Sequence, residues 1–224
     1  MSHPQLGLSN DELLSTTRAV RKRLDFSRPV ERETLAECME IATQAPTGSN
    51  AQGWQFVFVT DADKRKRIGE LYQQAFEIYR TMPQAIHKLH KDSGDNDLVS
   101  SQDRSASSAD YLADHMGEAP VLFIPCIAGR VDQPETNNIL AQSAIFGSII
   151  PAAWSFLLAL RARGIGSAWT TLHLMHEKEI ADLLGIPYDD FMQVALIPIA
   201  YTKGTDFKKA YRPPVSEVMH FDQW

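Results

Sequence analysis

The feature that most constrains the fold is an uncharged stretch at residues 137–160, NNILAQSAIFGSIIPAAWSFLLAL. A helix of this length could cross a bilayer core of about 30 Å. However, the stretch contains polar side chains such as Asn137, Gln142 and Ser148, and the chain as a whole is acidic, with a formal net charge of -6. A helix that is apolar nearly all round also occurs at the centre of a globular protein or in a dimer interface. We therefore predict a core or interface helix and no membrane partner.

Composition predicts one globular domain. The 224 residues are 44% hydrophobic, which is enough for a sizeable core, and no internal repeat divides residues 1–224. The acidic balance argues against a nucleic-acid partner, because phosphate-backbone binding needs a broad cationic face. The two cysteines, Cys38 and Cys126, are far apart and suggest no disulfide framework, and the N-terminus lacks a signal-peptide pattern. These features favour a cytoplasmic protein.

Hydrophobic periodicity and capping residues predict a mixture of helices and strands. Helices are expected at residues 10–14, 29–45, 61–79, 110–116, 137–163 and 177–184, and strands at 54–60, 119–128, 166–172 and 191–201. The intervening residues 83–108 are polar and rich in Ser and Asp, which predicts a mobile excursion. Because the elements do not alternate in regular βαβ units, we predict an α+β fold.

Several familiar catalytic patterns are absent from the sequence. Gly164 and Gly166 could begin a dinucleotide-binding fingerprint, but Trp169 stands where its third glycine belongs. The pairs His87/His90 and His173/His176 lack a spaced third ligand, so we expect surface or capping histidines and no metal site. No GxSxG elbow or P-loop occurs, which argues against a serine hydrolase and an NTPase.

Four polar clusters remain, in a fixed order along the chain: Thr17-Arg18-Ala19-Val20-Arg21 ahead of Pro29-Val30, residues 45–54 (APTGSNAQGW), residues 164–171 (GIGSAWTT), and residues 211–218 (YRPPVSEV). They resemble, respectively, the Arg-Arg-Ser-x-Arg, Ala-Pro-Ser-x-x-Asn-x-Gln-Pro-Trp, Gly-Leu-Gly-x-x-Trp/Thr and Arg-x-Pro-Leu-x-x-x-Val motifs of the FMN-dependent nitroreductase family. The resemblance extends from about residue 12 to the C-terminus and is weakest between residues 81 and 119.

The resemblance implies a set of FMN-binding residues. They are Thr17, Arg18, Ala19, Val20, Arg21, Pro46, Thr47, Gly48, Asn50, Gln52, Thr170, Thr171, Leu172 and Arg212. A flavin phosphate needs charge-assisted donors, which the arginines supply, and the amides of Asn50 and Gln52 suit the polar edge of the ring. Thr17 and Ala19 replace the family's first arginine and serine, so only main-chain contacts carry over there, and Gly53 replaces a proline.

The resemblance also implies a fold and an activity. The expected fold is a central, mainly antiparallel sheet flanked by helices in an intertwined homodimer, with two FMN molecules bound between the subunits. The expected reaction uses NAD(P)H to reduce a small aromatic acceptor, such as a nitroaromatic or a quinone, by a ping-pong mechanism. The chemistry takes place at N5 of FMN, so no catalytic side chain is needed. Tyr72, Phe76 and Tyr79 are candidates for shaping the acceptor pocket.

Other functions remain open at this point. The same scaffold could support reductive dehalogenation or another flavin reaction, including one that depends on oxygen. A protein of a different class, a non-catalytic flavin-binding sensor, would carry the same cofactor motifs. Residues 18–23 could be read as a nucleic-acid contact, but the acidic balance of the chain disfavours it.

Overall fold

The computed structural model of the chain describes residues 5–224. Its centre is a six-stranded sheet in which neighbouring strands follow the order β1-β6-β3-β2, with β4 paired to β6 and β5 paired to β3. The strands are β1 (Leu24–Asp25), β2 (Trp54–Val59), β3 (Val121–Ala128), β4 (Ile165–Ser167), β5 (Phe191–Gln193) and β6 (Ile197–Thr202). All five strand pairs are antiparallel, which confirms the predicted type of sheet.

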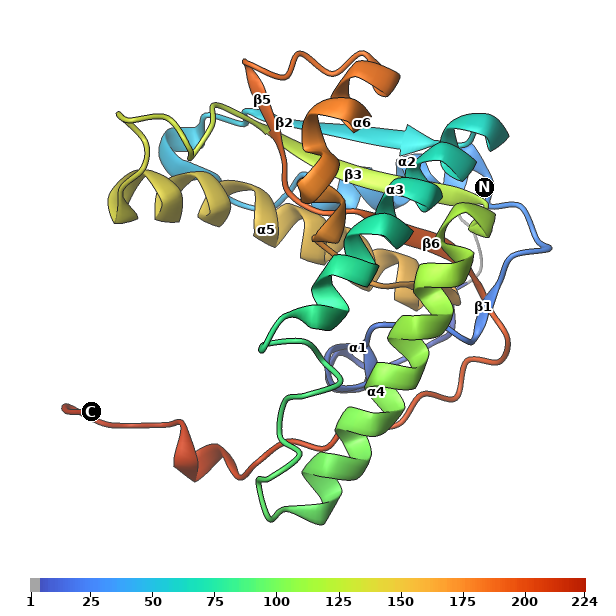
Figure 1. Cartoon of the computed structure of the whole chain (residues 1–224), viewed down its shortest axis with the longest axis vertical. Coiled ribbons are helices and arrows are strands. Elements are labelled where there is room, and N and C mark those ends of the chain that lie inside the picture. Colours follow the sequence, from blue (N-terminus) through green and yellow to red (C-terminus); the bar gives the residue numbers. More distant parts are fainter. Residues whose placement is uncertain (1–4) are drawn as a thin grey trace.

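Helices cover both faces of this sheet (Figure 1). They are α1 (Asn10–Thr16), α2 (Arg32–Ala42), α3 (Ala62–Thr81), α4 (Asn96–His115), α5 (Ile139–Ala162) and α6 (Glu177–Leu184). Ser9 and Asp61 cap α1 and α3 as their positions predict, and Gly185 ends α6 in a left-handed conformation with φ 72°. Each of these boundaries follows from local chemistry that can be read in the sequence.

Strand β3 shows why the sheet needs two helical layers. Side chains alternate between the two faces of a strand. Leu122 and Ile124 belong to a core cluster with residues of α3, α4 and α6, whereas Val121 and Phe123 belong to a cluster with residues of α2 and α5. Only Ala128 at the end of β3 is exposed, so this strand is buried on both faces, as its continuous apolar run predicts.

Helix α4 begins much earlier than the sequence suggests. We expected a helix only from Asp110 and an excursion before it, but α4 starts at Asn96, where Asp95 accepts hydrogen bonds from the next backbone amides. Ala106 is its only fully buried residue before Leu112, so an apolar stripe is almost absent there. Polar contacts from distant segments, such as Gln102 Nε2 to the carbonyl of Ile86 at 2.7 Å, hold this half instead. Mobility of residues 83–108 stays a prediction.

Two predicted strands are shorter than their apolar runs. The run at 166–172 forms β4 only as far as Ser167, and a short 3-10 helix, η3 (Leu172–His176), follows it. The run at 191–201 divides into β5 and β6, because Leu196 leaves the ladder to form a bridge with Thr170. The two-residue strand β1 has no periodicity that would predict it.

Helix α5 is a core helix in its second half only. Its fully buried residues lie between Ser148 and Arg161, and they pack against α2 and the sheet. Its first turn is exposed: Ile139 and Leu140 have relative accessibilities of 84% and 82%. By length and composition α5 could still span a membrane. The prediction of a core helix is therefore confirmed for the second half, and an apolar, uncovered surface remains on the first.

His173, which we expected at the surface or in a cap, lies fully buried in η3. Neither of its ring nitrogens has a hydrogen-bond partner among the described residues. Burial therefore lowers the pKa of His173 to about 3, so the imidazole is neutral in the folded protein.

This burial predicts a pH-dependent stability. Below about pH 6.5 the unfolded chain protonates His173 and the folded chain does not. The free energy of unfolding should therefore fall as pH drops from about 6.5 toward 3, by up to roughly 1.4 kcal/mol per pH unit from this group. Urea unfolding between pH 7 and 5 measures the slope. His173→Leu should flatten it, and the exposed-residue control His220→Gln should not; an unchanged slope in His173→Leu would contradict the assignment.

Candidate functional site

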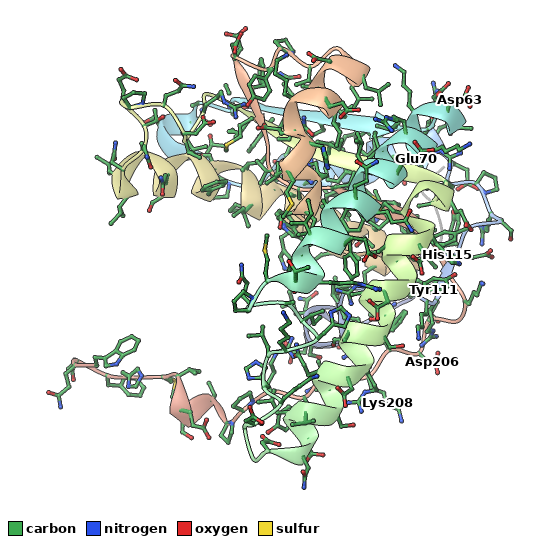
Figure 2. All side chains as sticks on the ribbon, viewed as in Figure 1. Asp63, Glu70, Tyr111, His115, Asp206 and Lys208 are labelled. Atoms are coloured by element: carbon green, nitrogen blue, oxygen red, sulfur yellow. The ribbon has the colours of Figure 1, made fainter. Side chains whose placement is uncertain are left out.

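A cavity of about 650 Å³ lies where the turn after α1, helix α4 and the C-terminal tail meet. Seven basic residues line it, and none of the described lining residues is acidic. The basic residues are Arg18, Arg21, Lys22, Arg23, Arg104, Lys209 and Arg212. Figure 2 shows how the tail, labelled at Asp206 and Lys208, runs alongside α4. A cavity lined by one sign of charge creates a strong local potential, and this one is suited to an anion.

The main chain of the first cluster is held against the third. The amide of Val20 donates to the carbonyl of Ser167 at 2.8 Å, and Ala19 forms a parallel bridge with Ser167. Gly166 makes this approach possible: a Cβ there would lie 2.6 Å from Thr202 Cγ2 and 3.1 Å from Val20 Cβ. The missing side chain of Gly166 thus sets the position from which Arg18 and Arg21 reach the cavity.

The C-terminal tail is fastened at two points on its way to the cavity. Phe207 makes cation–π contacts with Arg23 and Arg161, whose guanidinium carbons lie 4.3 and 5.0 Å from the ring centroid. Further along, the hydroxyl of Tyr211 donates to the carboxylate of Asp95, the residue that caps α4. These contacts bring Lys209 and Arg212 to the side of α4.

Arg21 connects the cavity to the third cluster. Its Nη1 donates to Ser108 Oγ of α4 at 3.3 Å, and among the described residues no carboxylate forms an ion pair with it. Burial lowers the pKa of Arg21, although an arginine remains protonated. Burial raises the pKa of the nearby Tyr72 to about 12, and Thr170 and Arg21 act in the opposite direction. Tyr72 thus lies near both Arg21 and Thr170, although Thr170 does not line the cavity.

The second cluster, residues 45–54, lies outside the basic cavity. None of the residues 46–52 lines the cavity. The short helix η1 (Gly48–Asn50) rests on α5, where the Gly48 amide donates to Ser148 Oγ at 3.0 Å. Figure 1 shows this segment, just before β2, at the start of α5 and away from α4 and the tail. Within one chain the structure therefore unites the first, third and fourth clusters and leaves the second apart.

The backbone of the second cluster is unusual for its residue types. Ser49, Asn50 and Gln52 adopt φ values of 53°, 53° and 49°, in the left-handed region that side chains other than glycine rarely occupy. The side-chain amide of Gln52 donates from Nε2 to Asn50 Oδ1 at 3.0 Å, and both side chains are exposed. Strained backbone of this kind gathers at ligand-binding sites.

The aromatic stripe on α3 belongs largely to the core, and its role in shaping an acceptor pocket stays a prediction. Tyr72 and Phe76 are buried in the cluster beneath the sheet, and the Tyr79 hydroxyl accepts a hydrogen bond from the Ile86 amide at 2.6 Å. None of the three lines the basic cavity. Among residues 5–224, no group of three or more His, Cys, Asp or Glu side chains could hold a metal ion.

Sequence reasoning missed part of the cavity wall. Lys22 and Arg23 lie beyond the matched motif. Arg104 comes from the segment 83–108, which was expected to be irregular, and Lys209 comes from the tail. Four neutral side chains of α4 join them: Ser101, Gln102, Ser105 and Ser108. The one signal in the sequence is Asp95, a residue type that often caps a helix. It could have indicated that α4 begins at Asn96 and that these residues share one helix.

Comparisons with known proteins show the family and the fold. The family model described as "Nitroreductase family" matches residues 14–201. The putative NAD(P)H nitroreductase YodC of Bacillus subtilis (strain 168) is 25% identical over 66% of this chain and 68% of its own. Iodotyrosine deiodinase 1 of Rattus norvegicus is 25% identical over 93% of this chain and 67% of its own. A variant of the FMN and NADPH-dependent nitroreductase NfnB from Sphigopyxis sp. strain HMH shares the fold, with a TM-score of 0.68 and 23% identity, over 97% of this chain and 100% of that one.

The close approach at Gly166 gives a testable prediction. Gly166→Ala should lower the free energy of unfolding by roughly 1–3 kcal/mol, because the added methyl group must displace Thr202 or Val20. Denaturant unfolding measures the change. Gly48→Ala is a matched control, since its Cβ would meet only Ser148 Oγ, at 3.4 Å. Equal stability of the two variants would show that β4 and the first cluster are not held this tightly.

Proposed function

We propose, from the premise that this chain belongs to the nitroreductase family, that it is an FMN-dependent oxidoreductase using NAD(P)H to reduce nitroaromatic, quinone or similar electron-poor acceptors. One observation carries the proposal. Arg18 and Arg21, near the N-terminus, and Arg212, near the C-terminus, line a single cavity with no acidic residue among its described walls. A phosphate monoester is an anion that such a set of guanidinium groups recognises well.

The residues present fit the phosphate of FMN. Arg21 is half-buried without a carboxylate partner among the described residues, so an anion would supply its missing counter-charge. Each charge-assisted hydrogen bond of this kind contributes about 1.5–3 kcal/mol. The side chain of Thr17 is already engaged, because its hydroxyl donates to the Leu13 carbonyl at 2.7 Å. The three arginines therefore carry the anchoring, and Thr17, Ala19 and Val20 contribute through their main chain.

Neither cysteine of the chain lines this cavity or is reactive. Burial raises the pKa of Cys38 to about 11 and that of Cys126 to about 12, so both thiols stay protonated. Bound FMN would supply the redox chemistry, accepting a hydride from NAD(P)H and then reducing the acceptor in a ping-pong order. The protein's own part is to hold the phosphate arm with arginines, and to place Thr170, Thr171 and Leu172 beside the flavin.

A homodimer would complete the site. Apolar side chains are exposed on α5 and on the tail, among them Ile139, Leu140, Trp154, Val218 and Phe221. Exposed apolar surface of this kind favours association. Because η1 rests on α5, pairing through α5 would carry residues 46–52 toward the cavity of the partner. We propose that each FMN is bound by residues of both subunits, in a cytoplasmic protein with no membrane or nucleic-acid partner.

Reductive dehalogenation is a second candidate reaction. It is favoured by one observation, the likeness to iodotyrosine deiodinase 1 over 93% of this chain. Purified protein with NADH or NADPH can be offered a nitroaromatic and an iodophenol in parallel. Faster nitroaromatic turnover supports the proposed function, and iodide release without nitro reduction supports the alternative. A flavin that NAD(P)H reduces but that no acceptor reoxidises would point to a sensor.

The anchoring arginines predict the effect of their removal. Arg21→Ala and Arg212→Ala should each weaken FMN binding about 10-fold or more, because each removes a charge-assisted contact to the phosphate. Fluorescence titration of FMN into the apoprotein measures the dissociation constant. Lys64→Ala, which removes an exposed charge outside the cavity, should leave it unchanged. Unchanged affinity in both arginine variants would refute the anchoring assignment, and wild-type protein that takes up no FMN would refute the function.

Sharing of the site between subunits can be tested by mixing variants. One subunit carries Arg21→Ala with Arg212→Ala, and the other carries Asn50→Ala with Gln52→Ala. If the loop serves the partner's cavity, a mixed dimer has one intact site and one doubly damaged site, so it should bind about half the FMN of wild type. If each chain forms its own site, both sites of the mixed dimer stay damaged and FMN binding is not restored.

A further inference from the structure

We propose that Lys22, Arg104 and Lys209 form a second anion subsite at the basic cavity, which binds the 2′-phosphate of NADPH and makes NADPH the preferred electron donor. The inference deepens the proposed function and rests on it. Its starting point is an excess of charge: seven basic residues line a cavity in which one flavin phosphate would need only some of them.

The charges can be assigned one by one. A phosphate monoester carries a charge of about -1.5 to -2 at pH 7, and Arg18, Arg21 and Arg212 already match it. Arg23 is neutralised within the chain, because its Nη2 lies 2.6 Å from Asp206 Oδ1. Three positive charges are left, on Lys22, Arg104 and Lys209.

These three residues have no counter-charge of their own. Among the described residues none of them forms an ion pair with a carboxylate. Lys22 Nζ donates to Ser107 Oγ at 2.7 Å and Arg104 Nη1 donates to Ser100 Oγ at 2.6 Å, which positions both side chains but leaves both charges unbalanced. Like charges brought together repel one another, so an external dianion would relieve the repulsion.

The wall between the three residues is suited to phosphate. Ser101, Gln102 and Ser105 of α4 line the same cavity and offer hydroxyl and amide donors. Two carboxylates lie beside the cavity without lining it: Asp206 is engaged by Arg23, and Asp95 accepts a hydrogen bond from Tyr211. A subsite with basic and neutral donors, and without a carboxylate, recognises a fully ionised phosphate rather than a hydroxyl group.

The positions of the three residues favour the donor over the acceptor as the source of this anion. Lys22, Arg104 and Lys209 are all exposed, as is Arg212, whereas Arg18 and Arg21 are half-buried. A dinucleotide is long, so its adenosine end leaves the flavin site and lies at the protein surface. A small aromatic acceptor lies over the flavin and would not reach the outer rim. A 2′-phosphate, present in NADPH and absent from NADH, is the matching group.

The test compares ligands that differ by this one phosphate. Isothermal titration of the FMN-loaded protein with adenosine 2′,5′-bisphosphate and with adenosine 5′-monophosphate measures binding without turnover, and kcat/KM for NADPH and NADH measures it with turnover. We expect wild-type protein to favour the bisphosphate and NADPH by at least 10-fold. The double variant Arg104→Ala with Lys209→Ala should lose most of this preference, and Arg104→Lys should retain part of it.

Controls separate this inference from the proposed function. Lys64→Ala with Lys91→Ala removes two exposed lysines outside the cavity and should preserve the preference. The double variant is compared with wild type at saturating FMN through the ratio of kcat/KM for NADPH to that for NADH, so a general loss of activity does not affect the readout. No preference in wild type, or a preference that the double variant keeps, overturns the subsite while leaving the flavin function intact. A loss confined to anionic acceptors, with the NADPH-to-NADH ratio unchanged, also overturns it, because it would place the anion on the acceptor.

Discussion

Like charges held together without acidic partners are the constraint on which the rest of this structure depends. Side chains such as Arg21 and Arg104 line one cavity without a carboxylate partner among the described residues, so contacts elsewhere must offset the repulsion between like charges. The hydrogen bond from Val20 to Ser167 fixes one wall, and the contacts of Phe207 and Tyr211 fix another. Stability supplied by the sheet thus offsets an electrostatic cost at the site. An anion removes that cost on binding, which is why ligand affinity and local order should be linked here.

Helix α5 leaves part of its apolar surface uncovered within one chain. Its second half fills the core between α2 and the sheet, but its first half exposes Ile139 and Leu140 to solvent. The loop that carries Asn50 and Gln52 rests on this helix, far from the basic cavity of the same chain. A second copy would cover the apolar surface and supply the missing part of the site at once. The second half of the uncharged run that at first suggests a membrane helix is buried in the core, and the proposed dimer would bury the first half.

Prediction from sequence succeeded where local chemistry decides the structure. The continuous apolar run of β3 requires burial on both faces, and the Ser9 and Asp61 caps begin helices where they should. Prediction from sequence failed where contacts between distant segments decide the secondary structure. The first half of α4 has too few apolar residues to be recognised, and it is helical because Asp95 caps it while Lys22, Arg21 and Ile86 contact it. The hydrophobic pattern also predicts too long a strand at 166–172, because nothing in this run shows that β4 ends at Ser167.

The sequence by itself determined the family of the protein, most of its elements, and the residue types that would meet an anionic cofactor, because each motif is a short run whose chemistry is local. Only the tertiary structure decided which of these runs come together. It joined Arg18 and Arg21 to Arg212, added Lys22, Arg104 and Lys209, and kept Asn50 and Gln52 apart. It also turned His173 into a buried neutral group and Tyr72 into core. The physical reason is that charge and burial depend on neighbours in space, and long-range packing sets those neighbours.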